Sequence, residues 1–326
     1  MRPLAAGDRL DAMRSIIDRD IARLEESIRA LKSRRNELSP ISRLPAEILC
    51  NIFSLTEDFS SRTRRPKSWT NFSQVSQHWR STALSAPELW TKIPLSYPRW
   101  AQEMLIRSKM AKLTIRSVFS FDESNPKAIE TIRSCLYEMN RIEELKLIVI
   151  PASNLEEIFR DLPKSAPQLH TLCIDSRSFP STFSIHEDFL YDTERLRHVE
   201  LVNCNISWDS RLLTGLTRLN LEDSLKANSS IIQFLHALQR LSTFTDLRLK
   251  DSTLDDSEGP STYPVVDLPC LRVLRISSGV GALTTVLRHP NSAILNLTCR
   301  ENQSIHIDFS NFLSILATKF LSSVVI

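Results

Sequence analysis

A short apolar pattern, L-x-x-L-x-L, recurs along the chain and constrains its fold more than any other feature. Seven copies begin at Met110, Ile142, Leu169, Leu196, Leu216, Phe244 and Leu271. Alternation of apolar and polar residues predicts a short strand, and here the fourth and sixth positions of each copy would point into a core. Successive copies start 20 to 32 residues apart, which leaves room for one return segment per strand. The pattern therefore predicts parallel strands stacked in chain order.

The repeat resembles the leucine-rich repeat family. One copy extends to the fuller form Leu196-x-x-Val199-x-Leu201-x-x-Cys204-x-Ile206. The resemblance implies an irregular solenoid whose parallel strands line a concave wall. Residues 154–162 and 231–238 have the spacing of helical returns. A weaker copy begins at Ala293, and the apolar segment 320–326 is either a last strand or a sign that the repeat lacks a full C-terminal cap.

The third and fifth positions of each copy face away from the core and form a candidate substrate face. The charged residues and the histidine proposed for it are Lys146, His198, Arg218, Arg248 and Arg275. Arginines on adjacent strands can bind carboxylate or phosphate groups. A mixed, solvated face is the simpler alternative. Cys173 and Cys204 fit strand or ladder positions and are expected to be inert buried or semi-buried thiols.

The first 39 residues predict one long amphipathic helix. An apolar seam is formed by Leu10, Ile17, Leu24, Leu31 and Leu38 at intervals of seven, with Ile21 and Ile28 between them. Such heptads resemble a coiled coil. Arg14 and Arg35 occupy other seam positions, so the stripe is imperfect. The helix either folds back on its own domain or self-associates through residues 10–38.

A compact apolar block follows Pro40. It opens with Leu44-Pro45-x-Glu47-Ile48-Leu49-x-x-Ile52-Phe53, whose apolar residues have helical spacing. Pro45 suits a first helical turn, where its missing N–H costs nothing. A second helix is expected over residues 69–83, with Phe72, Val75, Trp79 and Ala83 on one face. A block of this size cannot bury all of its large apolar side chains. We therefore expect a partner to cover the apolar side chains that stay exposed. A self-contained helical subdomain is the alternative.

The block resembles the F-box motif, as found in large fungal families, over residues 40–93. Its departure from the motif is a longer polar insertion at residues 58–68. The resemblance implies three short helices that bind a Skp-type adaptor, and through it the cullin scaffold of a ubiquitin ligase. The adaptor-binding residues implied are Leu44, Pro45, Ile48, Leu49, Ile52 and Phe53, braced by Val75, Trp79 and Trp90.

Composition argues against several other classes of protein. The chain has 5 glycines and no glycine-rich phosphate motif. Its formal charge of +3 argues against a dedicated nucleic-acid or membrane-surface binder. The 6 cysteines form no C-x-x-C pair, which indicates thiols of a reducing compartment. Without a signal peptide or membrane span in the sequence, we expect an intracellular protein of the cytoplasm, the nucleus or both, with no catalytic, cofactor-binding or metal site.

These observations predict an α plus α/β fold in three parts. A coiled-coil-like helix over 1–39 precedes an F-box domain over 40–93 and a leucine-rich-repeat-like domain over 94–326. The function expected from the resemblance is a substrate-recognition adaptor subunit of a Skp–cullin–F-box ubiquitin ligase. Its repeats would hold a protein substrate that the sequence does not identify. The alternative is a non-catalytic interaction scaffold with no link to ubiquitination.

Overall fold

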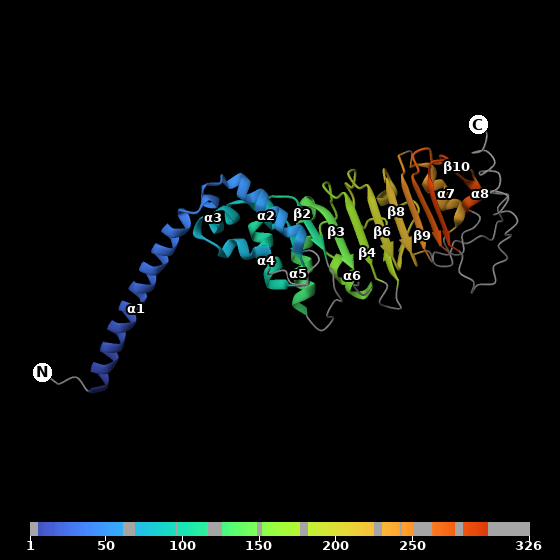
Figure 1. The fold of residues 1–326 in the computed structure, drawn as a ribbon. Helices are drawn as coiled ribbons and strands as arrows, with labels where there is room; N and C mark the ends of the chain where they lie inside the picture. Colours follow the sequence, from blue (N-terminus) through green and yellow to red (C-terminus); the bar gives the residue numbers. More distant parts are fainter. Residues whose placement is uncertain are drawn as a thin grey trace. The chain divides into compact units, whose positions relative to one another are not determined.

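The computed structural model describes residues 6–60, 69–95, 97–116, 126–148, 152–176, 182–224, 230–241, 243–250, 263–277 and 283–298 (Figure 1). Two compact units make up the chain, Met1–Leu89 and Trp90–Ile326. Helices, including a long N-terminal one, occur together with a parallel sheet, which confirms the α plus α/β class. The segment 320–326 and Cys299 lie outside the described residues.

The first unit is helical. Helix α1 (Ala6–Glu37) is followed by a 3₁₀ helix (Pro40–Arg43), α2 (Ala46–Ser60), a second 3₁₀ helix (Trp69–Gln74) and α3 (Gln77–Ser85). Leu38 and Ser39 close α1 by hydrogen bonds to the carbonyls three residues earlier, at 3.3 and 3.0 Å. Pro40, which has no N–H, then begins the next element, because a proline cannot continue the helix. No described helix is long and apolar enough to cross a membrane.

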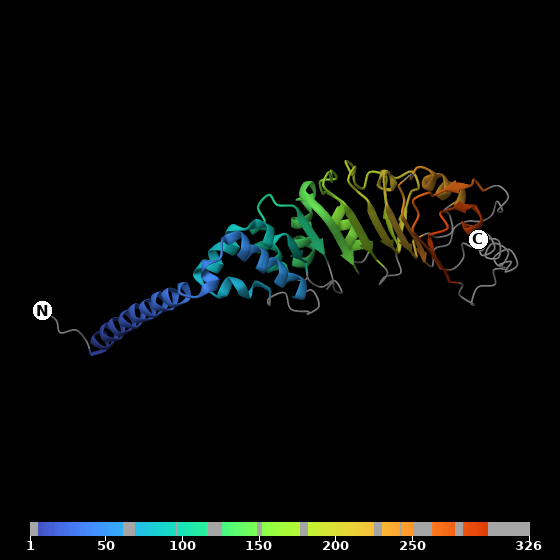
Figure 2. The same cartoon turned by 45° about the horizontal axis from the view of Figure 1, so that its top comes forward.

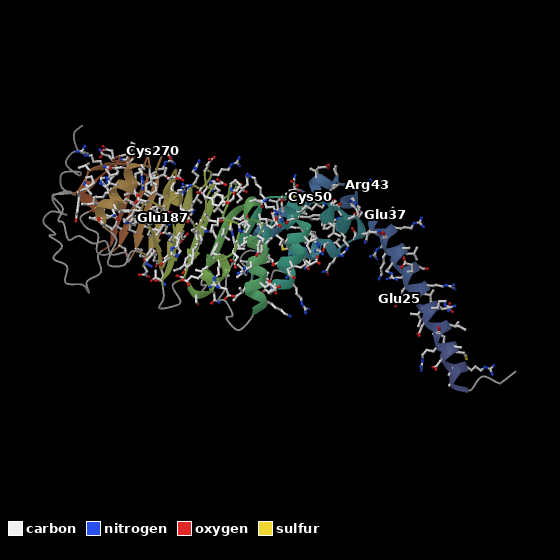
Figure 3. The ribbon with its side chains drawn as sticks, turned by 180° about the vertical axis from the view of Figure 1, so that it is seen from behind. Glu25, Glu37, Arg43, Cys50, Glu187 and Cys270 are labelled. Carbon is white, nitrogen blue, oxygen red and sulfur yellow. The ribbon has the colours of Figure 1, made fainter. Side chains whose placement is uncertain are left out.

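The heptad seam of α1 is exposed along its whole length. Its seven apolar residues have exposed fractions between 48% at Ile21 and 76% at Leu38. Side chains, Glu25 and Glu37 among them, project from the helix on all sides (Figure 3). The alternative in which the seam packs against its own domain is therefore wrong for this structure.

The second unit is built on a sheet of nine parallel strands. In spatial order they are β1 (Lys92–Pro94), β2 (Leu113–Arg116), β3 (Ile142–Ile148), β4 (Thr171–Asp175), β6 (His198–Val202), β8 (Arg218–Glu222), β9 (Asp246–Lys250), β11 (Val273–Ser277) and β13 (Ile294–Thr298). This spatial order is also the chain order, as Figures 1 and 2 show. Every copy of the apolar pattern, the weaker one included, lies on a strand. Among the nine strands of this sheet, β1 alone precedes the pattern and was not predicted from the sequence.

The strand register explains why the pattern has its spacing. From β3 onward, the fourth positions of successive copies are paired directly across the sheet, for example Leu145 with Leu172, and so are the sixth positions, for example Leu147 with Ile174. Between β2 and β3 the register is shifted, so that Ile115 pairs with Leu145. Both positions are fully buried in these strands. Each strand therefore completes the burial of its neighbour's apolar pair.

Helices and short strands return the chain from one strand to the next. The helices are α4 (Pro98–Arg107), α5 (Pro126–Leu136), α6 (Ala152–Phe159), α7 (Ile231–Gln239) and α8 (Leu283–Val286). Two small parallel sheets pair β5 (Phe183–Ile185) with β7 (Cys204–Ile206), and β10 (Val266–Asp267) with β12 (Leu287–Arg288). Helices α6 and α7 fall on the predicted returns and confirm them.

The same hydrogen bonds recur as the chain leaves successive strands. The N–H groups of Ser176, Asn203 and Asp223 each donate to a carbonyl of the next strand at 2.8–3.0 Å. Asn203 and Asp223 both have positive φ, of 53° and 50°, a conformation that Asn and Asp tolerate better than other side chains. Equivalent residues thus make the same turn out of the sheet.

A side-chain donor also recurs, three residues after the sixth pattern position. The Cys204 thiol donates to the carbonyl of Ile174 at 3.7 Å, and the Ser224 hydroxyl donates to the carbonyl of Leu201 at 2.8 Å. Ile174 and Leu201 hold the same pattern position on consecutive main strands, β4 and β6. These bonds tie the segment that follows each strand to a buried carbonyl of the preceding main strand.

Strand β1 spans the predicted boundary between residues 93 and 94 and belongs to the second unit. It is preceded by Trp90, which is fully buried. The Trp90 ring lies 6.0 Å from that of Trp100, edge to face, and the Arg107 guanidinium lies 4.6 Å from the Trp90 ring centre. Cation–π and aromatic contacts therefore stabilise the packing around the first residues of the second unit.

We expect Trp90→Ala to destabilise the second unit by about 3–5 kcal/mol, the usual cost of deleting a buried tryptophan. Denaturant unfolding followed by circular dichroism measures the loss, and hydrogen exchange of the β1–β3 amides locates it. Tyr137→Ala, at an exposed ring, is the control and should change stability by less than about 0.5 kcal/mol. Equal effects of the two variants would contradict this assignment.

Candidate functional site

Helix α2 starts where the sequence predicts, one residue after Pro45. The Pro45 carbonyl accepts the N–H groups of Ile48 and Leu49, both at 3.1 Å. Glu47 lies in the first turn, where a carboxylate is favoured by the helix dipole. Pro45 itself lies directly before the helix, which begins at Ala46, and its carbonyl accepts the first helical hydrogen bonds.

The structure divides the predicted adaptor-binding residues between two faces of α2. Leu49 and Phe53, with exposed fractions of 0% and 1%, belong to the core. These two side chains therefore present no free surface in this structure, and their predicted contact with an adaptor stays a prediction. Pro45 and Ile48 are exposed, whereas Leu44 and Ile52 are half-buried.

An apolar stripe runs along the exposed side of α2. We define the α2 stripe as Ile48, Ile52 and Leu55, which share one face of α2 at spacings of four and three residues, together with Ile41, Leu44 and Pro45 just before the helix. Leu55 is 64% exposed and Ile48 45%. The sequence analysis missed Leu55, although the helical period from Ile48 through Ile52 leads to it.

Phe53 holds the core of the first unit. Its ring stacks on Phe72, with centroids 4.3 Å apart and planes 9° apart, and lies 5.2 Å from the ring of Trp79. Three aromatic side chains from α2, the second 3₁₀ helix and α3 thus converge in one cluster. The predicted bracing role of Trp79 agrees with this contact.

The single helix predicted over residues 69–83 is wrong. Ser76 is extended, with φ −154° and ψ 165°, and its hydroxyl accepts the N–H of Trp79 at 3.2 Å. This N-cap starts α3 afresh and separates it from the 3₁₀ helix before it. As a consequence Val75, predicted to brace the core, is 54% exposed in the turn between them. Trp90, also predicted to brace it, packs with Trp100 in the second unit.

The outward face of the nine-stranded sheet contains all five predicted substrate-face residues. Thr171, His198, Arg218, Asp246 and Val273 follow one another in one row across five strands. Lys146 and Arg248 belong to the next row, together with Arg275. Arg218 therefore lies diagonally from Arg248 and not beside it.

Two of these residues, Lys146 and Arg218, are already engaged in ion pairs within the chain. Lys146 pairs with Glu144 at 2.7 Å, and Arg218 pairs with Asp246 at 3.6 Å. Burial alone would raise the pKa of Glu144, but hydrogen bonds from Lys146 and Arg116 outweigh it and hold that pKa below its usual value. Burial lowers the pKa of His198, so its imidazole is neutral at pH 7.

Arg248 and Arg275 differ from the rest of the row. They are direct neighbours on β9 and β11, both exposed, and neither forms an ion pair with any described residue. Asn220 lies beside Arg248 and Asn296 beside Arg275, so four hydrogen-bond-donating side chains follow one another across the sheet. Two guanidinium groups on adjacent strands are suited to one carboxylate or phosphate.

We expect Arg275→Thr to raise stability by about 0.5 kcal/mol, because like charges directly opposite each other destabilise a sheet. Arg218→Thr, the matched control, removes a paired arginine from the same face and should give no such gain. Denaturant unfolding of the two variants measures the difference. A loss of stability in Arg275→Thr equal to that in Arg218→Thr would contradict the unpaired charge.

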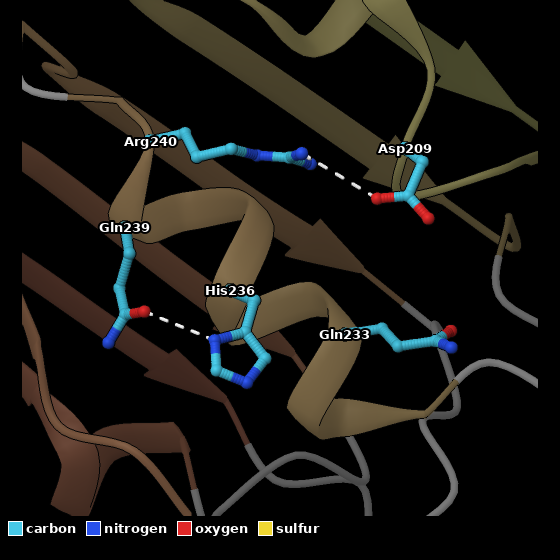
Figure 4. Close-up of a pocket in the computed structure, with 5 residues that line it drawn as sticks. All are labelled: Asp209, Gln233, His236, Gln239 and Arg240. Atoms are coloured by element: carbon cyan, nitrogen blue, oxygen red, sulfur yellow. Dashed lines mark hydrogen bonds and ion pairs between the residues drawn. The ribbon is translucent and has the colours of Figure 1, made fainter.

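A separate polar cavity of about 420 Å³ is lined by Asp209, Gln233, His236, Gln239 and Arg240 (Figure 4). Its side chains are largely bonded to the protein. Arg240 donates to the Trp208 carbonyl at 2.6 Å, and the Gln239 amide donates to the Val265 carbonyl at 3.2 Å. His236 contacts Gln239 at 3.2 Å, not a carboxylate. Asp209 pairs with Arg240 at 3.6 Å, so the carboxylate of the cavity is bonded to a guanidinium and not to the imidazole. Among the described residues no cluster suits a metal ion.

The buried cysteines have unreactive thiols, and none of the described cysteines forms a disulfide. Burial raises the pKa of Cys135, Cys173 and Cys204 to about 12 in each case. This agrees with the inert thiols expected at Cys173 and Cys204. Cys270, labelled in Figure 3, is exposed.

We expect iodoacetamide at pH 8 to label Cys270 in the native protein while sparing Cys135, Cys173 and Cys204. A thiol with a pKa of about 12 is ionised in about one molecule in 10⁴ at that pH, and only the thiolate reacts. Reactivity of the buried thiols should rise with pH towards 12 or on unfolding. Peptide mass spectrometry identifies the labelled sites, and native labelling of Cys135 as fast as Cys270 would contradict the burial.

Residues 41–96 of the chain match the F-box-like family model. The match includes the whole α2 stripe, the aromatic cluster of the first unit and the start of the second unit through β1. F-box domains in general bind Skp-type adaptors. No curated protein matches the chain. The chain therefore contains an F-box-like domain, as its sequence predicted.

Proposed function

We propose that this protein is the substrate-recognition subunit of a Skp–cullin–F-box ubiquitin ligase. The observation that carries the proposal is the coincidence of the F-box-like match at 41–96 with an exposed apolar stripe on α2. An apolar helix face laid into a partner's groove is a common mode of protein recognition. The adaptor would cover the α2 stripe, and the cullin would be bound through the adaptor.

The division of α2 into two faces supports this role. Leu49 and Phe53 hold the helix to its own unit, so the opposite face is presented on a fixed support. A rigid, preorganised helix loses little conformational entropy when a partner binds. The stripe's surface would thus serve binding, while the inner face serves folding.

The second unit would be a leucine-rich-repeat-type solenoid that holds a protein substrate. The equivalent hydrogen bonds of Cys204 and Ser224, with the recurring turns at Asn203 and Asp223, support this assignment. A repeated fold supplies an extended surface, here the outward face of the nine strands. The protein would catalyse no bond chemistry itself and would act by raising the local concentration of a substrate lysine.

Arg248 and Arg275 would be the leading substrate contacts on this surface. Both are exposed and unpaired among the described residues, whereas Lys146 and Arg218 would have to exchange internal partners first. An acidic or phosphorylated side chain would suit the two arginines. His198, neutral and half-buried, would contribute as a hydrogen-bonding group and not as a cation.

The test is capture of a purified Skp-type adaptor by the full chain and by Ile48→Glu. A charge in the centre of the α2 stripe should lower adaptor affinity at least tenfold, because the carboxylate would have to be desolvated on binding. Isothermal titration calorimetry measures the affinity. The matched control is Ser54→Glu, an equal charge on another exposed side of the same helix.

Loss of binding in Ile48→Glu with retention in Ser54→Glu would support the proposal. Failure of the folded wild-type chain to bind the adaptor would overturn it. The second candidate, an interaction scaffold outside the ubiquitin system, is favoured by the exposed heptad seam of α1, which adaptor binding does not require. That candidate predicts self-association without adaptor capture.

A further inference from the structure

The apolar seam of α1 has no role in the proposed function. Six apolar seam residues are exposed on this helix of 32 residues, with Leu38 directly after it, and none of them is covered by another described part of the chain. A stripe of this length is more than the scattered exposed apolar residues of an ordinary surface.

Little else stabilises this helix. Its ion pairs, Arg14–Asp11 at 3.7 Å, Arg23–Asp20 at 3.8 Å and Arg29–Glu26 at 2.9 Å, are highly exposed and therefore contribute little. Most helices in proteins are stabilised by burying an apolar face against another element. An exposed seam thus indicates a partner outside this chain.

The heptad positions identify the kind of partner. With Leu10 at position d, the d positions are Leu10, Ile17, Leu24, Leu31 and Leu38, and the a positions are Arg14, Ile21, Ile28 and Arg35. The central layers thus have Ile at a and Leu or Ile at d. A second copy of the same helix supplies a seam of the same length and residue types.

A parallel pair of α1 helices would place like charges together. Each seam residue would face its own copy, so Arg14 would face Arg14 and Arg35 would face Arg35. Asp20 at position g would also lie beside Glu25 at position e of the other copy. The e and g positions set helix orientation through such contacts. A parallel pair gains no opposite-charge contact from these positions.

An antiparallel pair removes the arginine layers. In the register that aligns Ile21 with Leu24 of the other copy, Arg14 faces Leu31 and Arg35 faces Leu10. The long arginine side chains can then lie along the apolar seam with their charged ends in water.

The e and g contacts favour the same register. Asp11 lies beside Lys32 of the other copy, twice by symmetry. One kind of like-charge contact remains, between Asp18 and Glu25, also twice by symmetry, and it matches the two Asp20–Glu25 contacts of the parallel pair. The balance of charges therefore favours the antiparallel arrangement.

We propose that α1 binds a second copy of itself as an antiparallel two-stranded coiled coil. The F-box-like domains follow the C-terminal ends of the two helices, so they would leave the coiled coil at opposite ends. A 32-residue helix is about 48 Å long at 1.5 Å per residue. The dimer would separate its two recognition arms instead of closing them on one substrate.

The association is tested on the full chain by analytical ultracentrifugation across the micromolar range. Ile17→Glu changes the seam, whereas Ile16→Glu changes the adjacent residue at position c, outside the seam. The two isoleucines have exposed fractions of 55% and 54%, so they are matched in the free helix. Wild type and Ile16→Glu should be dimeric, and the dissociation constant of Ile17→Glu should rise at least a hundredfold.

The orientation is tested by oxidation of cysteine variants, with the wild-type chain as background for its native thiols. Leu10→Cys alone should form no additional disulfide dimer, because the two positions lie at opposite ends. Leu10→Cys mixed with a differently sized, tagged Arg35→Cys chain should form a mixed disulfide. Mixed disulfide formation supports the antiparallel register, and efficient self-linking of Leu10→Cys would overturn it.

A monomeric wild-type chain, or equal weakening by Ile16→Glu and Ile17→Glu, would overturn the proposal as a whole. Adaptor capture does not enter these measurements. Failure here therefore leaves the proposed ligase function intact, and failure of adaptor binding leaves the coiled coil intact.

Discussion

Burial of two apolar positions per strand is the constraint on which the second unit depends. A short strand has one apolar face and cannot bury it alone, so each fourth and sixth position needs the equivalent residues of the neighbouring strands. The direct pairing of Leu145 with Leu172 and of Leu147 with Ile174 shows how this requirement fixes the register. A slip by one residue would turn every apolar pair toward solvent. The register that aligns the buried residues also aligns the outward-facing residues between them. Arg248 and Arg275 are direct neighbours for this reason.

The two faces of helix α2 meet opposite requirements: one face must be buried and the other must stay exposed. Its inner face must hold the unit together, which it does through Phe53 and its stacked partner Phe72. Its outer face keeps apolar residues exposed, Ile48 and Leu55 among them. If these residues were buried within the unit, a partner could not contact them. Position on the helix, and not residue type, separates the two roles, since leucine and isoleucine occur on both faces.

Much of this architecture could be predicted because periodicity is a local property of the sequence. The spacing of seven predicted α1, the L-x-x-L-x-L pattern predicted the strands of the nine-stranded sheet from β2 onward, and the motif at Leu44–Phe53 predicted the F-box-like domain. The short strands of the two small sheets were not predicted. Errors arose where a single contact outweighs a pattern. The N-cap at Ser76 divided a predicted helix and left Val75 in a turn. Strand β1 has no pattern of its own and forms because β2 offers it a parallel edge.

The sequence by itself determined which residues are apolar and at what period, and these decide the type and order of the elements. The tertiary structure alone decided which apolar residues are buried and which charges have partners. Leu49 and Ile48 are neighbours in the sequence, yet one lies in the core and the other on the surface. Arg218 and Arg248 hold neighbouring outward positions of the same pattern, yet only Arg218 has a carboxylate beside it in the sheet. Burial and ion pairing depend on atoms brought together from distant parts of the chain, and sequence spacing does not determine those distances.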